Sequence, residues 1–218
     1  KKRFDSRREQ AEKRRDVHAK PLNRKEGFSA AQADPAAFIP DVLVRLPPQT
    51  ITAGGADGYT LRIPELTVRK QSRIALTGAN GTGKTLLAYT VLNRIREAAQ
   101  QKRGDDASLY FYLPQEISEA EEQAVLAHFF SLDTKICSEI LSTVYRMGSN
   151  PETLLTFTDG KRISPGELRK LMIALAMCKP LRLLILDEPT NHLDILSVRL
   201  LETALAEISC ALLIVSHD

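Results

Sequence analysis

A glycine-rich run at residues 78–85 constrains the fold of this chain more than any other part of the sequence. Residues 73–77 before it resemble a short apolar strand, and residues 86–99 after it carry apolar side chains at helical spacing. Glycines in such a loop let backbone N–H groups curl around phosphate groups, and the start of the next helix adds its positive dipole. A turn that fits the pattern by chance is the alternative, and the strand-loop-helix context disfavours it. The residues expected to bind a nucleotide are Gly78, Ala79, Asn80, Gly81, Thr82, Gly83, Lys84 and Thr85.

Two side chains of this phosphate loop (residues 78–85) have specific expected roles. Lys84 should reach the β- and γ-phosphate oxygens, and the Thr85 hydroxyl should bind Mg²⁺. The sequence lacks an Asn-Lys-x-Asp motif that would recognise guanine, so we expect the nucleotide to be ATP. ATP and Mg²⁺ are therefore the predicted cofactors.

A second motif places two carboxylates at the end of an apolar strand. Residues 183–186 are Leu-Leu-Ile-Leu, and Asp187 and Glu188 follow them directly. In a parallel sheet, groups at the carboxyl end of a strand face the ligand crevice. Asp187 is the natural anchor for Mg²⁺, and Glu188 is placed to polarise the water that attacks the γ-phosphate. The alternative is an ordinary acidic turn before Pro189.

The order of elements predicts an α/β fold with a parallel sheet. Strand-like residues at 42–46, 50–52 and 60–68, broken by a turn cluster at 53–58, come first. Further strands are expected at 109–113, 183–186 and 211–215, and the last two are apolar without alternation, as in strands buried on both faces. Helices are expected at 86–99, 164–177 and 197–208, together with two helices within 118–147 that are interrupted near residues 133–134.

Length and composition exclude several classes of protein. At 218 residues and 24.2 kDa, the chain can form one α/β core with a subdomain, but not two full nucleotide-binding domains. No apolar run reaches the roughly 18–20 residues that span a bilayer, so we expect no membrane insertion. Cys137, Cys178 and Cys210 lack metal-binding spacing and are interpreted as reduced thiols, which predicts a cytoplasmic protein.

Charge is distributed unevenly along the chain. Residues 1–25 hold 11 basic and 4 acidic side chains, whereas the remainder is mildly acidic. Residues 1–20 predict a polar helix with Lys or Arg and Glu at i, i+4 spacing, which Pro21 should end. Residues 26–41 are interpreted as a connecting segment. Because the chain starts with Lys1 rather than Met and stops at Asp218 just after an apolar run, we expect it to be a fragment.

Three weaker candidates each have a simpler structural interpretation. Gln115 follows the strand at 109–113 and could contact Mg²⁺ or the attacking water, or be a solvated turn residue. His217 follows the strand at 211–215, where it could sense the γ-phosphate. Ser164-Pro-Gly-Glu167 forms a capping box with proline at the first helical position, and the same helix start could bind an anion.

Taken in order, these motifs resemble those of ABC-type ATPases. Residues 78–85, Gln115, 164–167, 183–188, Asp194 and His217 look like the Walker A, Q-loop, signature, Walker B, D-loop and switch motifs. The resemblance covers roughly residues 42–218. The run Asp187-Glu-Pro-Thr-Asn-His-Leu-Asp194 is similar to the ABC-F subfamily, soluble twin-domain ATPases that act on the ribosome, several of them in translation control or antibiotic resistance.

The resemblance implies a P-loop NTPase domain of the ABC type. Its sheet would be mostly parallel, with an N-terminal antiparallel β part, a helical subdomain at about 116–160, and an ATPase domain over 42–218 that is truncated at its C-terminus. Glu188, His217 and Gln115 would be catalytic. The metal ligands would be Thr85, Gln115 and Asp187.

The resemblance also implies partners. ABC domains form a head-to-tail sandwich, so Ser164, Gly166 and Glu167 would contact ATP held by a second ABC domain, in the same polypeptide or in a dimer, and Asp194 would couple the two sites. This chain would then be the second ATPase domain, and the basic helix would be the end of an interdomain linker that contacts tRNA and the ribosome. A solvated charged helix is the alternative for residues 1–25.

The expected function is therefore ATP hydrolysis on the ribosome, in translation regulation or antibiotic resistance. The alternatives are the ATPase subunit of a membrane ABC transporter and a scaffold that binds ATP without hydrolysing it. The sequence also departs from the family pattern. Pro165 replaces the usual signature glycine and removes one backbone N–H, and no arm is inserted between Gln115 and Ser164. Tyr59 could stack on adenine or be an ordinary strand residue.

Overall fold

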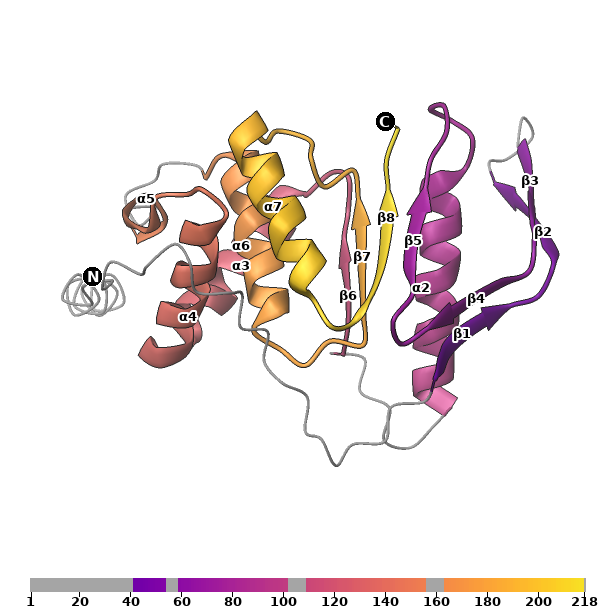
Figure 1. Cartoon of the computed structure of the whole chain (residues 1–218), viewed down its shortest axis with the longest axis horizontal. Helices are drawn as coiled ribbons and strands as arrows, with labels where there is room; N and C mark the ends of the chain where they lie inside the picture. The colour runs from indigo at the N-terminus through magenta and orange to yellow at the C-terminus, as the bar shows by residue number, and fades with distance from the viewer. Residues whose placement is uncertain (1–40, 54–58, 102–108, 156–162, 218) are drawn as a thin grey trace. The chain divides into compact units, whose positions relative to one another are not determined.

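The computed structural model describes residues 41–53, 59–101, 109–155 and 163–217 (Figure 1). The chain divides into two compact units. The sheet unit contains described residues 41–53, 59–101, 109–115, 179–189 and 209–217, and the helical unit contains 116–155, 163–178 and 190–208. The predicted basic helix at 1–20 and the connecting segment at 26–41 lie outside the described residues, apart from Asp41.

A four-stranded parallel sheet forms the centre of the sheet unit, as predicted. Its strands are β5 (Arg73–Leu76), β6 (Tyr110–Leu113), β7 (Leu183–Asp187) and β8 (Ala211–Val215), in the spatial order β5-β8-β7-β6. Every residue of β7 is buried, which explains its continuous apolar sequence. All four strands are parallel, so their carboxyl ends lie at one edge of the sheet.

Two antiparallel ladders make up the N-terminal β part. β1 (Val42–Leu46) pairs with β4 (Leu66–Arg69), and β2 (Gln49–Ala53) pairs with β3 (Tyr59–Ile63). The strand-like stretch 60–68 therefore forms two strands with different partners rather than one. The break falls at Pro64 and Glu65, where proline cannot donate to a ladder.

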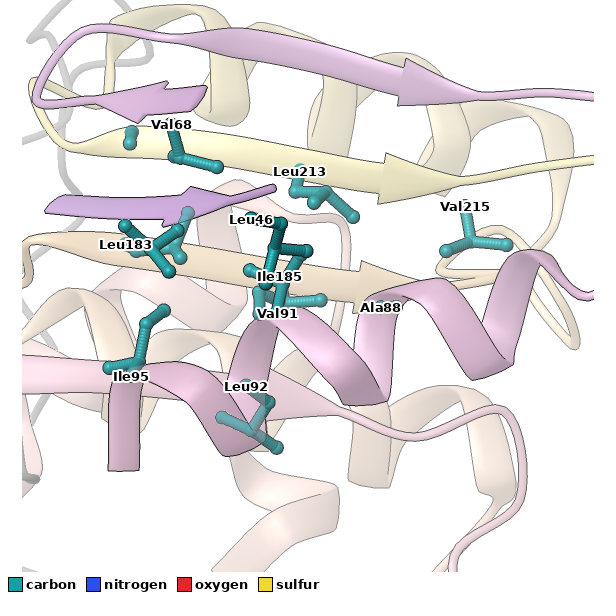
Figure 2. Packing of buried hydrophobic residues seen from close by; sticks show 12 residues of the cluster. Leu46, Val68, Ala88, Val91, Leu92, Ile95, Leu183, Ile185, Leu213 and Val215 are labelled. Carbon is teal, nitrogen blue, oxygen red and sulfur yellow. The ribbon is translucent and has the colours of Figure 1, made fainter. Parts of the chain in front are cut away.

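Helix α2 (Lys84–Gln101) supplies the apolar side chains that pack on the strands. Ala88, Val91, Leu92 and Ile95 lie at positions i, i+3, i+4 and i+7 on one face of the helix and are all buried. Figure 2 shows this face meeting residues of β1, β4, β7 and β8. Burying one large aliphatic side chain contributes about 1.5–3 kcal/mol, so this cluster stabilises the segment that carries the phosphate loop.

The described residues of the helical unit contain five helices: α3 (Glu119–Ser131), α4 (Thr134–Arg146), α5 (Pro151–Leu155), α6 (Pro165–Met177) and α7 (Ile195–Glu207). The predicted interruption between the first two is confirmed at residues 132–133. The short helix α5 was not expected. Among the helices in the described part of the chain, none is both long and apolar enough to cross a membrane.

Local sequence explains where α3 starts and how α4 packs. Ser118 caps α3 by accepting a hydrogen bond from the backbone N–H of Glu121, whose carboxylate accepts from the Ser118 N–H in return. The Ser118 hydroxyl also donates to this carboxylate, at 2.7 Å. This bond, and then the one from the Ser118 backbone N–H, lower the pKa of Glu121. Helix α4 buries Ile140 and Val144, four residues apart, and contacts α6.

Replacing Ile185 with alanine should destabilise the chain strongly. Ile185 in β7 is 1% exposed within the aliphatic cluster, so the substitution leaves a cavity that costs about 2–5 kcal/mol. The matched control is Ile195→Ala, because Ile195 is 77% exposed and surface changes stay within about 0.5 kcal/mol. Chemical denaturation followed by circular dichroism measures both, and equal losses would contradict the packing described here.

Candidate functional site

The backbone of the phosphate loop requires glycine at three positions. Gly78, Gly81 and Gly83 have φ values of +142°, +79° and +93°, a region that other residues rarely adopt. Gly83 also meets a close neighbour, since an added Cβ would lie 2.9 Å from a methyl carbon of Leu61 in β3. The glycine spacing recognised in the sequence thus reflects real backbone constraints.

Lys84 is the first residue of α2 and folds back over the loop. Its Nζ donates hydrogen bonds to the carbonyl oxygens of Gly78, at 2.7 Å, and Ala79, at 3.1 Å. Thr82 closes the same turn by donating its hydroxyl to the Ala79 carbonyl at 2.9 Å. The first N–H groups of a helix lack intrahelical partners, so the ammonium and these amides together form a site for an anion.

Asp187 ends β7 and is fully buried. Its Oδ2 accepts a hydrogen bond from the Tyr112 phenol at 3.2 Å, while Oδ1 is buried without a hydrogen-bond partner. Within the described residues, no group of three His, Cys, Asp or Glu side chains could hold a metal ion. Mg²⁺ commonly binds one or two carboxylates together with nucleotide phosphates, so an unpartnered carboxylate oxygen fits that ion. Thr85, in the first turn of α2, is a second expected ligand, and Gln115 is the third.

Glu188 and His217 form a pair at the ends of adjacent strands. Nδ1 of His217 lies 2.8 Å from Oε2 of Glu188. A carboxylate can only accept, so the imidazole donates through Nδ1. Glu188 is 4% exposed and has φ of +48°, a left-handed conformation that costs about 1–2 kcal/mol for such a residue. Its N–H donates to the Val215 carbonyl at 3.0 Å, which holds it in this conformation.

Sheet topology brings most of the predicted site residues to one edge. The phosphate loop follows β5, Gln115 follows β6, Glu188 follows β7 and His217 follows β8. Gln115 is exposed there. The predicted adenine contact of Tyr59 cannot be placed in this arrangement, because its side chain lies outside what the structure describes.

The signature residues belong to the helical unit. Ser164 caps α6, accepting a hydrogen bond from the Glu167 N–H at 3.2 Å, and Pro165 occupies the first helical position. The predicted capping box forms only in part, because the Glu167 carboxylate accepts from Lys170 instead, at 3.2 Å.

Gly166 has a packing role that sequence reasoning missed. An added Cβ would lie 2.5 Å from the backbone oxygen of His192, in the segment before α7. His192 itself has φ of +64°. The signature helix therefore packs directly against the backbone that leads to Asp194, and only a residue without a Cβ fits this contact.

Asp194 caps α7. Its carboxylate accepts hydrogen bonds from the backbone N–H of Ser197, at 2.9 Å, and from the Ser197 hydroxyl, at 2.7 Å. The Ser197 side chain, then its backbone N–H, and more weakly the charge of Lys170 lower the pKa of Asp194. Asp194 is thus ionised at neutral pH and fixed by its own helix.

Comparison with known protein families decides which family this chain belongs to. Residues 61–191, more than half of the chain, match the family described as ABC transporter. The chain belongs to this ABC transporter family. It is an ATPase domain of the ABC type, as its motifs indicated.

Three relatives show which members of the ABC transporter family are similar. The ATP-binding protein Uup-like of Haemophilus influenzae is 34% identical over 157 residues, which are 70% of this chain and 34% of the relative. ATP-binding protein Uup of Caulobacter vibrioides is 32% identical, over 71% of this chain and 24% of its own length. Ribosome protection protein VmlR of Bacillus subtilis is 29% identical, over 78% of this chain and 31% of its own length. These relatives support the ABC-F type, and the chain spans about a third of their length or less.

Solved structures confirm the fold. The dimeric structure of MJ0796, a bacterial ABC transporter cassette, has a TM-score of 0.60 at 15% identity and covers 80% of this chain and 88% of that one. A post-hydrolysis state of MJ0796 bound to ADP and Pi gives a TM-score of 0.60 at 14% identity, with the same coverage. At these identities the likeness establishes the ABC fold alone.

Replacing Gly166 with alanine should lower stability, although alanine normally favours a helix. The added methyl group meets a backbone oxygen that cannot rotate away, and such overpacking costs about 1–3 kcal/mol. Urea denaturation measures the change. Pro165→Ala, at the exposed preceding position, is the control and should lose no more than about 1 kcal/mol. A Gly166→Ala variant as stable as the original chain would show that the contact with His192 is absent.

Proposed function

We propose that this domain binds ATP with Mg²⁺ and hydrolyses it at the carboxyl edge of the parallel sheet. The observation that carries the proposal is the pair of Glu188 and His217, which lies at the same edge as the phosphate loop. A buried carboxylate held by an imidazole beside an anion site is suited to orient a water molecule for attack on phosphorus.

Each residue has a defined task in the proposed reaction. Water attacks the γ-phosphorus and the bond to the bridging oxygen of ADP breaks, which releases phosphate. Glu188 accepts a hydrogen bond from the water and then its proton, and His217 keeps that carboxylate in place. Lys84 and the loop amides stabilise the negative charge that develops on the phosphate oxygens.

Mg²⁺ fits the residues present at this edge. Asp187, through its unpartnered Oδ1, and the Thr85 hydroxyl would hold it, and Gln115 is a further candidate ligand at the same edge. When bound, the ion neutralises charge on the β- and γ-phosphates.

A second ABC domain completes the proposed site. On this proposal Ser164, Gly166 and Glu167 contact a nucleotide held by that domain, and Asp194 lies between the two sites. Two exposed apolar residues support such a contact: Ile195 and Leu196, directly after Asp194, are 77% and 64% exposed. The partner domain belongs to the same polypeptide or to a second copy.

We further propose that the complete protein acts in the cytoplasm on the ribosome, in translation regulation or antibiotic resistance. Support comes from the similarity to a ribosome protection protein and from the basic charge of residues 1–25. In this proposal residues 1–25 end an interdomain linker that contacts the ribosome and tRNA, residues 26–41 connect it, and residues 42–218 form the ATPase domain, with a helical subdomain at about 116–160.

A membrane transporter subunit is the second candidate function. The fold that this chain shares with the transporter cassette MJ0796 supports it. An ABC-F protein would have the same fold, so the fold alone does not separate the two functions. Stimulation of ATP turnover by ribosomes favours the first function, and stimulation by a membrane-embedded partner favours the second.

Replacing Glu188 with glutamine should reduce ATP turnover at least about 100-fold, because an amide cannot accept the proton of the attacking water. Binding of a non-hydrolysable ATP analogue should remain close to that of the original protein. Phosphate release is measured in the polypeptide that carries this domain with its partner domain, in the presence of ribosomes. Glu202→Gln, an exposed change on α7, is the matched control. Unchanged turnover in Glu188→Gln would remove Glu188 from the reaction.

A further inference from the structure

A tyrosine with no role in the mechanism above contacts Asp187, one of the expected metal ligands. Tyr112 in β6 lies opposite Ile185 in the parallel ladder with β7. Asp187 is two residues beyond Ile185, so its side chain leaves the same face of the sheet. The Tyr112 phenol reaches along this face and donates to Oδ2 of Asp187 at 3.2 Å.

This hydrogen bond divides the two oxygens of Asp187 between different tasks. Oδ2 is engaged by the phenol, while Oδ1 is buried and has no partner. A buried carboxylate oxygen without a partner is energetically costly, and a cation placed there removes that cost. The phenol also opposes rotation of the carboxylate, so the same oxygen remains available.

A second tyrosine packs against the first. The rings of Tyr89, in α2, and Tyr112 have centroids 4.8 Å apart and are tilted by 51°. Tyr89 comes four residues after Thr85, on the same side of the helix. The ring contact of Tyr89 with Tyr112 and the hydrogen bond of Tyr112 to Asp187 therefore link α2, which carries Thr85, through β6 to β7, which carries Asp187.

A tyrosine phenol ordinarily ionises at about pH 10, so Tyr112 is protonated at neutral pH and is the donor in its hydrogen bond with the Asp187 carboxylate.

We propose that Tyr112 is a positioning residue for the metal site. Its phenol holds Oδ2 of Asp187 and thereby leaves Oδ1 available to the ion. Tyr89, in α2, packs against the Tyr112 ring and limits its movement. This inference rests on the proposed function, because it concerns the Mg²⁺ bound with ATP. Replacing a residue that hydrogen-bonds to a metal ligand without touching the metal typically lowers metal affinity about 10–100-fold.

The test compares metal affinity with nucleotide affinity. Tyr112→Phe keeps the ring and removes only the hydroxyl. The chain is saturated with a non-hydrolysable ATP analogue, and binding of Mn²⁺ to the complex is followed by electron paramagnetic resonance. We expect Tyr112→Phe to weaken Mn²⁺ binding about 10-fold, while the affinity for the analogue in EDTA stays unchanged. Tyr110→Phe, in the same strand, should match the original chain in both measurements.

A second variant keeps the proposal falsifiable if Tyr112→Phe folds poorly. Tyr89→Ala leaves the Tyr112 phenol in place but removes the ring that packs against it. It should also weaken Mn²⁺ binding, to a smaller extent than Tyr112→Phe. A folded Tyr112→Phe variant that binds Mn²⁺ as tightly as the original chain would overturn the proposal. If Tyr112→Phe does not bind the analogue in EDTA, the result for Tyr89→Ala decides: Mn²⁺ binding as tight as in the original chain would overturn the proposal.

The same experiment separates this inference from the proposed function. If the complex of the original chain binds Mn²⁺ no more tightly than the free analogue does, the metal site itself is wrong. If the original chain binds Mn²⁺ tightly and Tyr112→Phe does so equally, only the role of Tyr112 is wrong.

Discussion

The hydrogen-bond ladders on either side of β7 are the constraint on which the candidate site depends. β7 pairs in parallel with β6 and β8, and these ladders set Asp187 opposite Val215. Side chains alternate between the faces of a strand, so a shift of one residue in this register would turn Asp187 to the opposite face. The register also brings the N–H of Glu188 to the Val215 carbonyl and thereby sets the direction of the carboxylate that meets His217.

The site concentrates energetically unfavourable features that the surrounding core offsets. Asp187 and Glu188 are buried acids, one with an unpartnered oxygen and the other with a left-handed backbone. Directly behind them, β7 and β8 supply fully buried aliphatic residues that pack on α2. Strained and poorly satisfied groups persist where the structure around them is over-determined, and they mark the place where a ligand supplies the missing contacts.

The sequence was sufficient for features that depend on residue type and local spacing. The phosphate loop, the acidic pair after β7 and the parallel sheet could be predicted, because glycine positions, an apolar strand and a following helix leave few alternatives. The break at Pro64 also has a local signal in the sequence, because proline cannot donate a hydrogen bond to a ladder. The contacts of Tyr112 with Asp187 and of Gly166 with His192 could not be predicted, because each joins segments that meet only in three dimensions. Roles for Tyr59 and residues 1–25 stay predictions.

The close approach of Gly166 to the His192 carbonyl bears on how relatives of this chain can diverge. The requirement for glycine at this position arises from the backbone of a neighbouring segment, and it exists before any nucleotide binds. A descendant that lost ATP hydrolysis would still need glycine there to keep the two segments together. Glycine at this position is therefore weak evidence of enzymatic activity in a homologous sequence, whereas the acid that follows β7 carries no such steric requirement and is the more informative marker.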